Sequence, residues 1–187
     1  MHRELPWLPP PASWHTRRQV FRFAAAGLVM APLVSRAAAT ESRALSFVHT
    51  HVDESLEVTY FRRGEYVPQA LAQLDHLLRD FRTEDVHPID PRLFDVLYDL
   101  QVLADREAPF EIVSGYRSPA TNAALRGHSG GVAKHSLHME GKAIDLRMTG
   151  YDTRKLRDLA LSMRCGGVGY YASSNFIHLD TGRVRSW

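Results

Sequence analysis

Residues 136–145 read S-L-H-M-E-G-K-A-I-D, and a second short stretch at 176–180 reads F-I-H-L-D. Apolar residues alternate with Asp145 in the first stretch and with His178 and Asp180 in the second. A period of two is typical of strands with one buried face and one open face. Two such strands lying side by side would deliver Asp145, His178 and Asp180 to one place, so the sequence predicts a site there.

Two imidazoles and two carboxylates are available for this site, because His138 would arrive from the loop before the first strand. Gly141 suits a turn in that loop with a positive φ or a close backbone approach. A catalytic zinc ion takes three protein ligands and keeps one position for water, and His138, Asp145 and His178 make such a set. Asp180 would then be a base or would orient a ligand, and the roles of His178 and Asp180 could be reversed. A His-x-Asp pair on a strand is also common at surfaces that hold no metal.

Apolar periodicity predicts two helices that pack on the core. Pro68 opens the first, which carries apolar residues at helical spacing as far as Phe81. Asp90 caps the second, which begins at Pro91. Residues 44–61 predict two strands joined by an acidic turn.

A short buried strand is predicted from Phe110, and S-G-Y-R-S follows at 114–118. Arg117 lies just past the end of that strand, where side chains often line a site. Its guanidinium could bind a carboxylate or a polarised carbonyl in a two-pronged manner, and a structural salt bridge is the alternative. Ser118 caps the next helix, on which Asn122 lies close behind Arg117.

These motifs together resemble those of a known family. S-L-H-M-E-G-K-A-I-D is similar to the S-x-H-x-x-G-x-A-x-D signature of the M15 zinc peptidases, which cut bacterial cell-wall peptides, and all five fixed positions are present. The segment at 114–118 resembles the one that carries the group's substrate-binding Arg. The sequence G-G-V-G-Y-Y…N-F-I-H-L-D-T-G resembles its closing metal-ligand strand. The likeness, greatest to the DUF882 branch, extends over nearly all of the chain after residue 39.

The resemblance implies an α+β fold shared with D-Ala-D-Ala dipeptidases and the zinc-binding domain of hedgehog proteins. In this fold a small antiparallel sheet carries the metal site and packs with helices. The resemblance also implies one Zn²⁺ per chain on His138, Asp145 and His178, with catalytic roles for Asp180 and Arg117.

The implied function is that of a zinc-dependent murein peptidase, an endopeptidase that hydrolyses the peptide cross-links of peptidoglycan in cell-wall remodelling. Arg117, Ser136 and Asn122 would contact the peptidoglycan stem peptide. Some relatives carry an acid where this chain has Asn175, so the identity of the base stays open, with Asp180 as the candidate. The alternatives are a non-catalytic, zinc-stabilised peptidoglycan-binding module, or a D,D- or L,D-carboxypeptidase acting on stem peptides.

Residues 1–39 are expected to be a twin-arginine signal peptide, and residues 40–187 one zinc peptidase domain. Arg17-Arg18 precedes an apolar run that is too short to span a bilayer comfortably, and Ala37-Ala38-Ala39 forms a small-residue cleavage site. This pattern predicts export by the twin-arginine pathway to the periplasm. An uncleaved N-terminal anchor is the alternative.

The net charge of the chain belongs to this leader. The whole chain has 23 basic and 21 acidic residues, of which the first 39 positions hold five Arg and one Glu, leaving 18 and 20. No cluster of basic residues indicates nucleic-acid binding. We expect no nucleic-acid partner, no membrane partner once the leader is removed, and a monomer.

One cysteine and two histidines outside the main motif are expected to have no part in the site. Cys165 is the single cysteine and can form no disulfide within the chain. It is expected to be a buried small apolar residue, with a metal ligand as the alternative. His49 and His51 are expected on a solvated strand face, with a second metal site as the alternative.

Overall fold

One mixed β-sheet organises the part of the chain that the structure, a computed structural model, describes: residues 42–128 and 132–187. The leader predicted at 1–39 lies outside these residues. The strands are β1 (Ser42–His49), β2 (Ser55–Arg62), β3 (Glu65–Tyr66), β4 (Phe110–Ser114), β5 (Ala143–Met148), β6 (Gly167–Tyr171), β7 (Phe176–Asp180) and β8 (Arg185–Ser186). The helices are α1 (Pro68–Leu77), α2 (Pro91–Leu103), α3 (Pro119–His128) and α4 (Thr153–Met163), with 3₁₀ turns η1 (Leu137–Glu140) and η2 (Ala172–Ser174).

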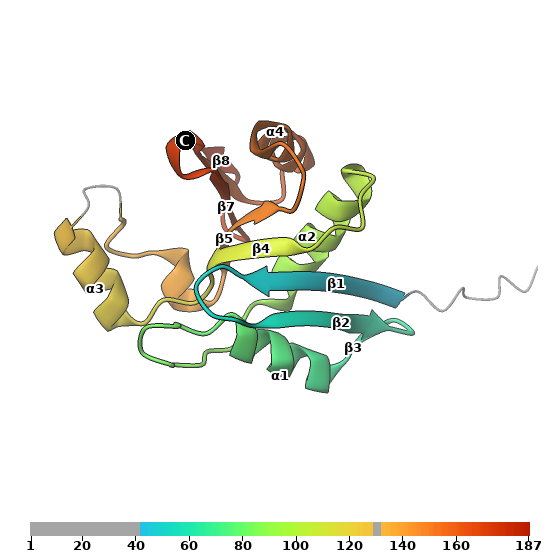
Figure 1. Cartoon of the computed structure of the whole chain (residues 1–187), viewed down its shortest axis with the longest axis horizontal. Coiled ribbons are helices and arrows are strands. Elements are labelled where there is room, and N and C mark those ends of the chain that lie inside the picture. Colours follow the sequence, from blue (N-terminus) through green and yellow to red (C-terminus); the bar gives the residue numbers. More distant parts are fainter. Residues whose placement is uncertain (1–41, 129–131) are drawn as a thin grey trace, which may run out of the picture. The chain divides into compact units, whose positions relative to one another are not determined.

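The strand order is β3-β2-β1-β4-β5-β7-β6-β8 (Figure 1). The strands around the predicted site, β4, β5, β7 and β6, pair antiparallel, whereas the pairs β1–β4 and β6–β8 are parallel. The α+β class is therefore confirmed, and the antiparallel strands that carry the site form the middle of a larger sheet.

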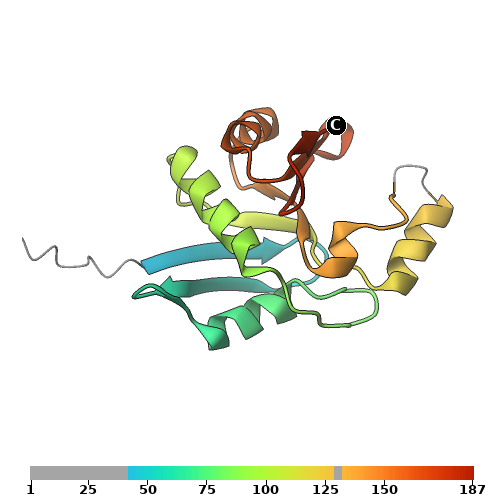
Figure 2. The same cartoon turned by 180° about the vertical axis from the view of Figure 1, so that it is seen from behind.

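The core lies between the sheet and the helices α1, α2 and α4. Figure 2 shows α2 crossing in front of β1 and β4 when the molecule is seen from behind. The largest fully buried side chains are Tyr60, Phe47, Phe94 and Phe110, packed with leucines from α1 and α2. Helix α3 instead lies beside η1, away from this core (Figure 1).

The two predicted core helices are present, with one difference at an end. Asp90 caps α2 by accepting a hydrogen bond from the Arg92 amide at 3.1 Å. Helix α1 ends at Leu77 and does not reach Phe81, because the Leu78 carbonyl accepts the amide of Tyr116 at 2.7 Å. The chain therefore leaves the helix in time to place Phe81 in a loop.

Two expectations about single residues are wrong. His49 is buried, with 3% of its surface exposed, because β1 turns Leu45, Phe47 and His49 to the core and leaves Val48 exposed. The predicted alternation between the two faces of the strand is present, but His49 lies on the buried face. His51 lies past the end of the strand and is exposed. Cys165 is exposed, because it lies in the connection after α4 and outside the packed face of that helix.

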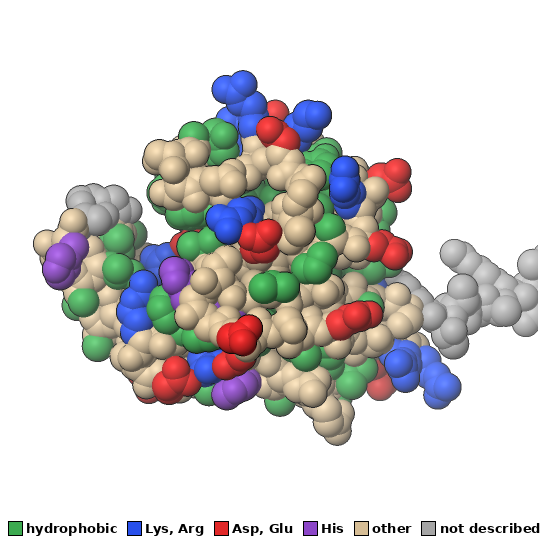
Figure 3. Space-filling model, in the orientation of Figure 1, with side chains coloured by type: hydrophobic (Ala, Val, Ile, Leu, Met, Phe, Trp, Pro, Cys, Tyr) green, Lys and Arg blue, Asp and Glu red, His purple; other side chains and the backbone are tan. Residues whose placement is uncertain are grey.

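On the face shown in Figure 3, acidic and basic side chains are interspersed and are not gathered by sign. Among the described residues, no helix is both long and apolar enough to cross a membrane.

Helix α2 provides a direct test of the core. Leu100 is fully buried, whereas Val102, two residues along the same helix, is 59% exposed. We expect Leu100→Ala to lower the free energy of unfolding by about 2–5 kcal/mol because it leaves a cavity, and Val102→Ala to change it by about 0.5 kcal/mol or less. Urea unfolding of both variants measures the difference, and equal losses would contradict this description of the core.

Candidate metal centre

Three potential metal ligands meet on the open side of β5 and β7. Asp145 on β5 lies directly opposite His178 on β7 in the antiparallel register, and η1 brings His138 beside them. His138 Nε2 lies 3.2 Å from Asp145 Oδ1 and 3.2 Å from His178 Nδ1, and the last two atoms are 2.8 Å apart. The sequence prediction that two neighbouring strands and the preceding segment assemble this set is confirmed.

Hydrogen bonds behind the two imidazoles fix which nitrogen faces the cluster. His138 Nδ1 lies 2.6 Å from the Gly115 carbonyl oxygen, and His178 Nε2 lies 3.0 Å from Asp180 Oδ2. Both partners are acceptors, so both of these nitrogens carry the proton. In the neutral form of each ring, the other nitrogens, His138 Nε2 and His178 Nδ1, therefore turn lone pairs towards Asp145.

Three acceptor atoms thus face one another, which fits a bound cation. They are the only group of three or more such ligands within the described ranges, and all three residues are buried. Ligand atoms around a tetrahedral zinc ion lie about 3.3 Å apart, given bonds near 2.0 Å to nitrogen and oxygen. The two separations of 3.2 Å match this spacing, and the third, 2.8 Å, is about half an ångström shorter. The residues present fit a single zinc-type ion.

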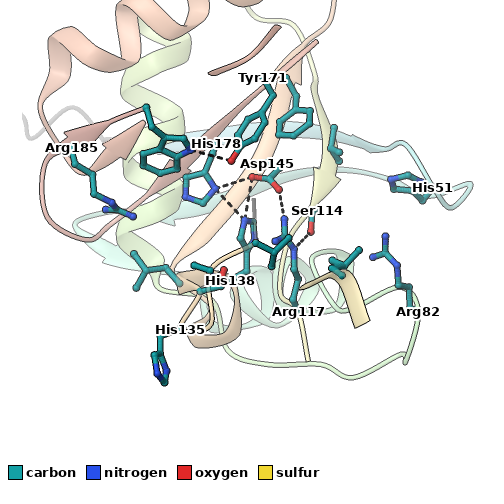
Figure 4. Close-up of a pocket in the computed structure, with 18 residues that line it drawn as sticks. His51, Arg82, Ser114, Arg117, His135, His138, Asp145, Tyr171, His178 and Arg185 are labelled. Carbon is teal, nitrogen blue, oxygen red and sulfur yellow. Dashed lines mark hydrogen bonds and ion pairs between the residues drawn. The ribbon is translucent and has the colours of Figure 1, made fainter. Parts of the chain in front are cut away.

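Arg117 orients the carboxylate of this set. Its Nη2 donates to Asp145 Oδ2, and its Nε donates to Ser114 Oγ at 3.0 Å. Because Arg117 occupies Oδ2, the other oxygen, Oδ1, is the one that faces the imidazoles. Arg117 also lines the cleft above the site (Figure 4). The structural salt bridge, one of the two interpretations of Arg117, is therefore present, and the side chain also lies in the cleft wall.

Asp180 lies behind His178 and is almost completely buried. Besides His178, it accepts hydrogen bonds from the amides of Gly167 and Gly182, each at 2.9 Å, and a two-pronged bond from Arg185. Each of these partners donates a hydrogen bond to the Asp180 carboxylate. The geometry is that of a group that orients the imidazole of His178.

The pKa shifts follow from this arrangement. Burial lowers the pKa of His138, against the opposing effect of Asp145, and favours the neutral ligand form. Burial alone would also lower the pKa of His178, but hydrogen bonds to Asp145 and Asp180 raise it. Burial would raise the pKa of Asp145 and of Asp180, yet the imidazoles, and for Asp180 also Arg185, hold both far below the usual range.

Two glycines allow the close approaches on which the site depends. At Gly115 an added Cβ would lie 2.4 Å from the Leu78 carbonyl oxygen, and the carbonyl of Gly115 is the partner of His138. Gly141 has φ +63° and would place a Cβ 2.2 Å from the Pro88 carbonyl oxygen. The positive φ and the close approach predicted for Gly141 are both observed.

The ligand set forms the floor of a cleft of about 490 Å³. Ser136 lies in its wall, where its hydroxyl accepts the His138 amide at 3.3 Å. Asn122 is buried behind the wall, and its Nδ2 donates to the Ala133 carbonyl at 3.2 Å. Glu140 is exposed and paired with Lys142, away from the cleft lining.

Several residues of the cleft were not predicted from the sequence. Tyr171 and Trp187 form one wall, with the Trp187 ring 5.2 Å from that of His178 and its Nε1 donating to the Tyr171 hydroxyl at 3.1 Å. His51 and Arg82 lie at the other end (Figure 4). The glycine at 169 was the one available signal for this wall, because an added Cβ there would meet the Trp187 ring at 2.6 Å.

The fold and the site define an α+β domain that presents a His–Asp–His metal-ligand set at the floor of a cleft. A family profile described as Peptidoglycan L,D-endopeptidase MepK matches residues 37–187. The chain is 43% identical over 175 residues to the Peptidoglycan L,D-endopeptidase MepK of Escherichia coli (strain K12), covering 91% of this chain and 96% of that protein. It is 47% identical over 146 residues to the probable peptidoglycan L,D-endopeptidase MepK of Haemophilus influenzae, covering 78% of each. The chain belongs to this family of M15 peptidases.

Asp180→Asn tests whether Asp180 orients a ligand or takes a proton. We expect zinc affinity to fall by about 10- to 100-fold, because His178 loses its charged partner, and peptide cutting to return at saturating zinc. Zinc titration and activity assays measure both quantities. Asp158→Asn, an exposed residue of α4, is the control. Cutting lost with unchanged zinc affinity would instead make Asp180 the base.

Proposed function

We propose that the protein is a zinc-dependent murein endopeptidase that hydrolyses peptide cross-links of peptidoglycan. One observation carries the proposal: three lone pairs of a His–Asp–His set converge on the floor of a cleft, in a chain that aligns with peptidoglycan L,D-endopeptidases over nearly its whole length. The buried ligands and the open cleft above them are what hydrolysis of an extended peptide requires.

Each residue of the site has its own role in this proposal. His138, Asp145 and His178 would hold the zinc ion, which supplies a Lewis acid and lowers the pKa of bound water. Asp180 holds the imidazole of His178 in place and, by accepting from Nε2, directs Nδ1 of the neutral ring to the ligand set. Arg117 holds Asp145 from behind, and its position in the cleft wall also suits binding of a substrate carbonyl. Ser136, in the same wall, would contact the stem peptide.

Asn122 is assigned an indirect part. Its buried side chain bonds the Ala133 carbonyl and thereby holds the segment that carries Ala133 and His135 along the cleft. In the proposal it shapes the substrate-binding wall and does not itself reach the peptide.

Zinc-dependent digestion of cell-wall sacculi tests the function. The purified protein is stripped of metal, refilled with zinc and incubated with sacculi, and the released muropeptides are separated by mass. We expect conversion of cross-linked dimers to monomers only with zinc, because the ion is needed at the ligand set.

Two histidine variants test whether release of monomers depends on the ligand set. His138→Ala removes a buried ligand and should abolish both zinc binding and release of monomers. His128→Ala removes an exposed histidine at the end of α3 and should change neither. Shortened stems with intact cross-links would indicate a carboxypeptidase, and zinc binding without any product would indicate a binding module.

We further propose that residues 1–39 are a twin-arginine signal that exports the protein to the periplasm. Replacing Arg17 and Arg18 together with Lys should leave the protein in the cytoplasm, because the arginine pair is the feature by which this signal class is recognised. Cell fractionation measures the outcome, with Arg36→Lys as the control. Periplasmic protein with the Lys-Lys leader would overturn this assignment.

A further inference from the structure

At one end of the cleft, two basic side chains of the lining stack on the ring of Phe81. The imidazole of His51 stacks on the ring of Phe81, with centroids 4.5 Å apart and planes at 12°. The guanidinium of Arg82 lies over the same ring, 4.1 Å from its centroid. His51 and Arg82 line the cleft, on the opposite side of the ligand cluster from Arg185 (Figure 4).

A buried arginine clamps together the two segments that carry these side chains. His51 lies between β1 and β2, whereas Arg82 lies in the connection that follows α1. Arg79, which is 6% exposed, donates two hydrogen bonds to Glu54 in the first segment and one to Glu84 in the second. These bonds are part-buried, since Glu84 is exposed, and charge-assisted bonds are among the stronger hydrogen bonds in proteins. The two segments at this end of the cleft are therefore held together by specific hydrogen bonds.

Asp80 ties the same segment to the metal site. Its Oδ1 accepts the amide of Arg82 at 3.1 Å, and its Oδ2 accepts the amide of Ser118 at 2.9 Å, next to Arg117. Asp80 is 1% exposed. Burial alone would raise its pKa, but hydrogen bonds from the Thr121 and Ser118 side chains and from these amides lower it, so the charged form is the one held here. The backbone of Arg82 is thus fixed relative to Arg117.

The charge of Arg82 differs from that of the other arginines of the cleft. Arg117 is paired with Asp145, and Arg185 is paired with Asp180. Asp145 is the one carboxylate among the described residues that line the cleft. Within the described ranges, no carboxylate pairs with the guanidinium of Arg82, whose contact is the ring of Phe81. A positioned guanidinium without an anionic partner in a cleft favours an anionic ligand.

We propose that Arg82, supported by Phe81 and His51, is the anchor for a free carboxylate of the peptide substrate. A guanidinium that lies over an aromatic ring keeps its N–H edges open for a two-pronged bond to a carboxylate. His51 offers a further polar group on the same wall. A peptide bound through this carboxylate would lie along the cleft across the ligand set, so Arg82 determines which peptides are cut.

This inference rests on the proposed function, since the ligand is taken to be the peptide that the site hydrolyses. Its test therefore uses matched substrates: one soluble cross-linked muropeptide with free carboxylates, and the same muropeptide with those carboxylates amidated. The variants are Arg82→Gln, Arg82→Lys and, as the control, Arg154→Gln on α4, an exposed arginine outside the cleft.

With the zinc-loaded protein, we expect Arg82→Gln to raise KM for the free-carboxylate muropeptide by about 10- to 100-fold, the range for loss of a charged hydrogen bond. The same variant should leave the amidated muropeptide unchanged. Arg82→Lys should restore part of the loss, because it returns the charge without the planar fork. Arg154→Gln should match the unaltered protein on both substrates.

Calorimetry on the metal-free protein separates this inference from the proposed function. The unaltered protein should bind the free-carboxylate muropeptide more tightly than the amidated one, and Arg82→Gln should remove that preference even if no bond is cut. Equal binding of the two muropeptides, or an equal loss on both substrates in Arg82→Gln, would overturn the subsite. Absence of any cutting by the zinc-loaded unaltered protein would overturn the proposed function alone.

Discussion

The site is governed by three lone pairs that face one another across about 3 Å. When both imidazoles are neutral, His138 Nε2, His178 Nδ1 and Asp145 Oδ1 are all acceptors, because the proton of each ring lies on the nitrogen that donates to Gly115 or Asp180. Such a cluster is unfavourable in a buried place unless a cation lies within it. Arg117 holds Asp145, and Arg185 holds Asp180 behind His178, so both arginines keep the ligands in this arrangement. The fold thus creates a site that requires a cation.

Much of this site can be predicted from the sequence, because local pattern and geometry agree there. A period of two places Asp145 and His178 on the open face of their strands, and the antiparallel pair sets them opposite each other. The requirement for glycine at 141 is likewise local, since φ is +63° and the Pro88 carbonyl leaves no space for a side chain. The caps of the helices follow the same logic, as Asp90 shows.

What the sequence could not predict depends on which elements cover which face. The sequence alternates around His49 as regularly as around His178, yet the face of β1 that carries His49 is covered by Phe81 and the core. The same pattern therefore places His49 in the core and His178 at the cleft. Arg82 is placed in the cleft by long-range contacts that no local pattern indicates: Arg79 joins Glu54 to Glu84, and Asp80 joins Arg82 to Ser118. Such long-range pairing needs the folded chain.

Chemistry and recognition consequently have different structural origins in this cleft. The ligands come from the middle strands of the sheet and from η1, where burial and backbone pairing leave little freedom. The carboxylate anchor comes from two connections at the edge, held by the buried charges of Arg79 and Asp80. A change confined to the Arg82 side chain can alter which peptide lies in the cleft, because that side chain makes no contact with His138, Asp145 or His178. Specificity can thus vary while the reaction at the ligand set is retained.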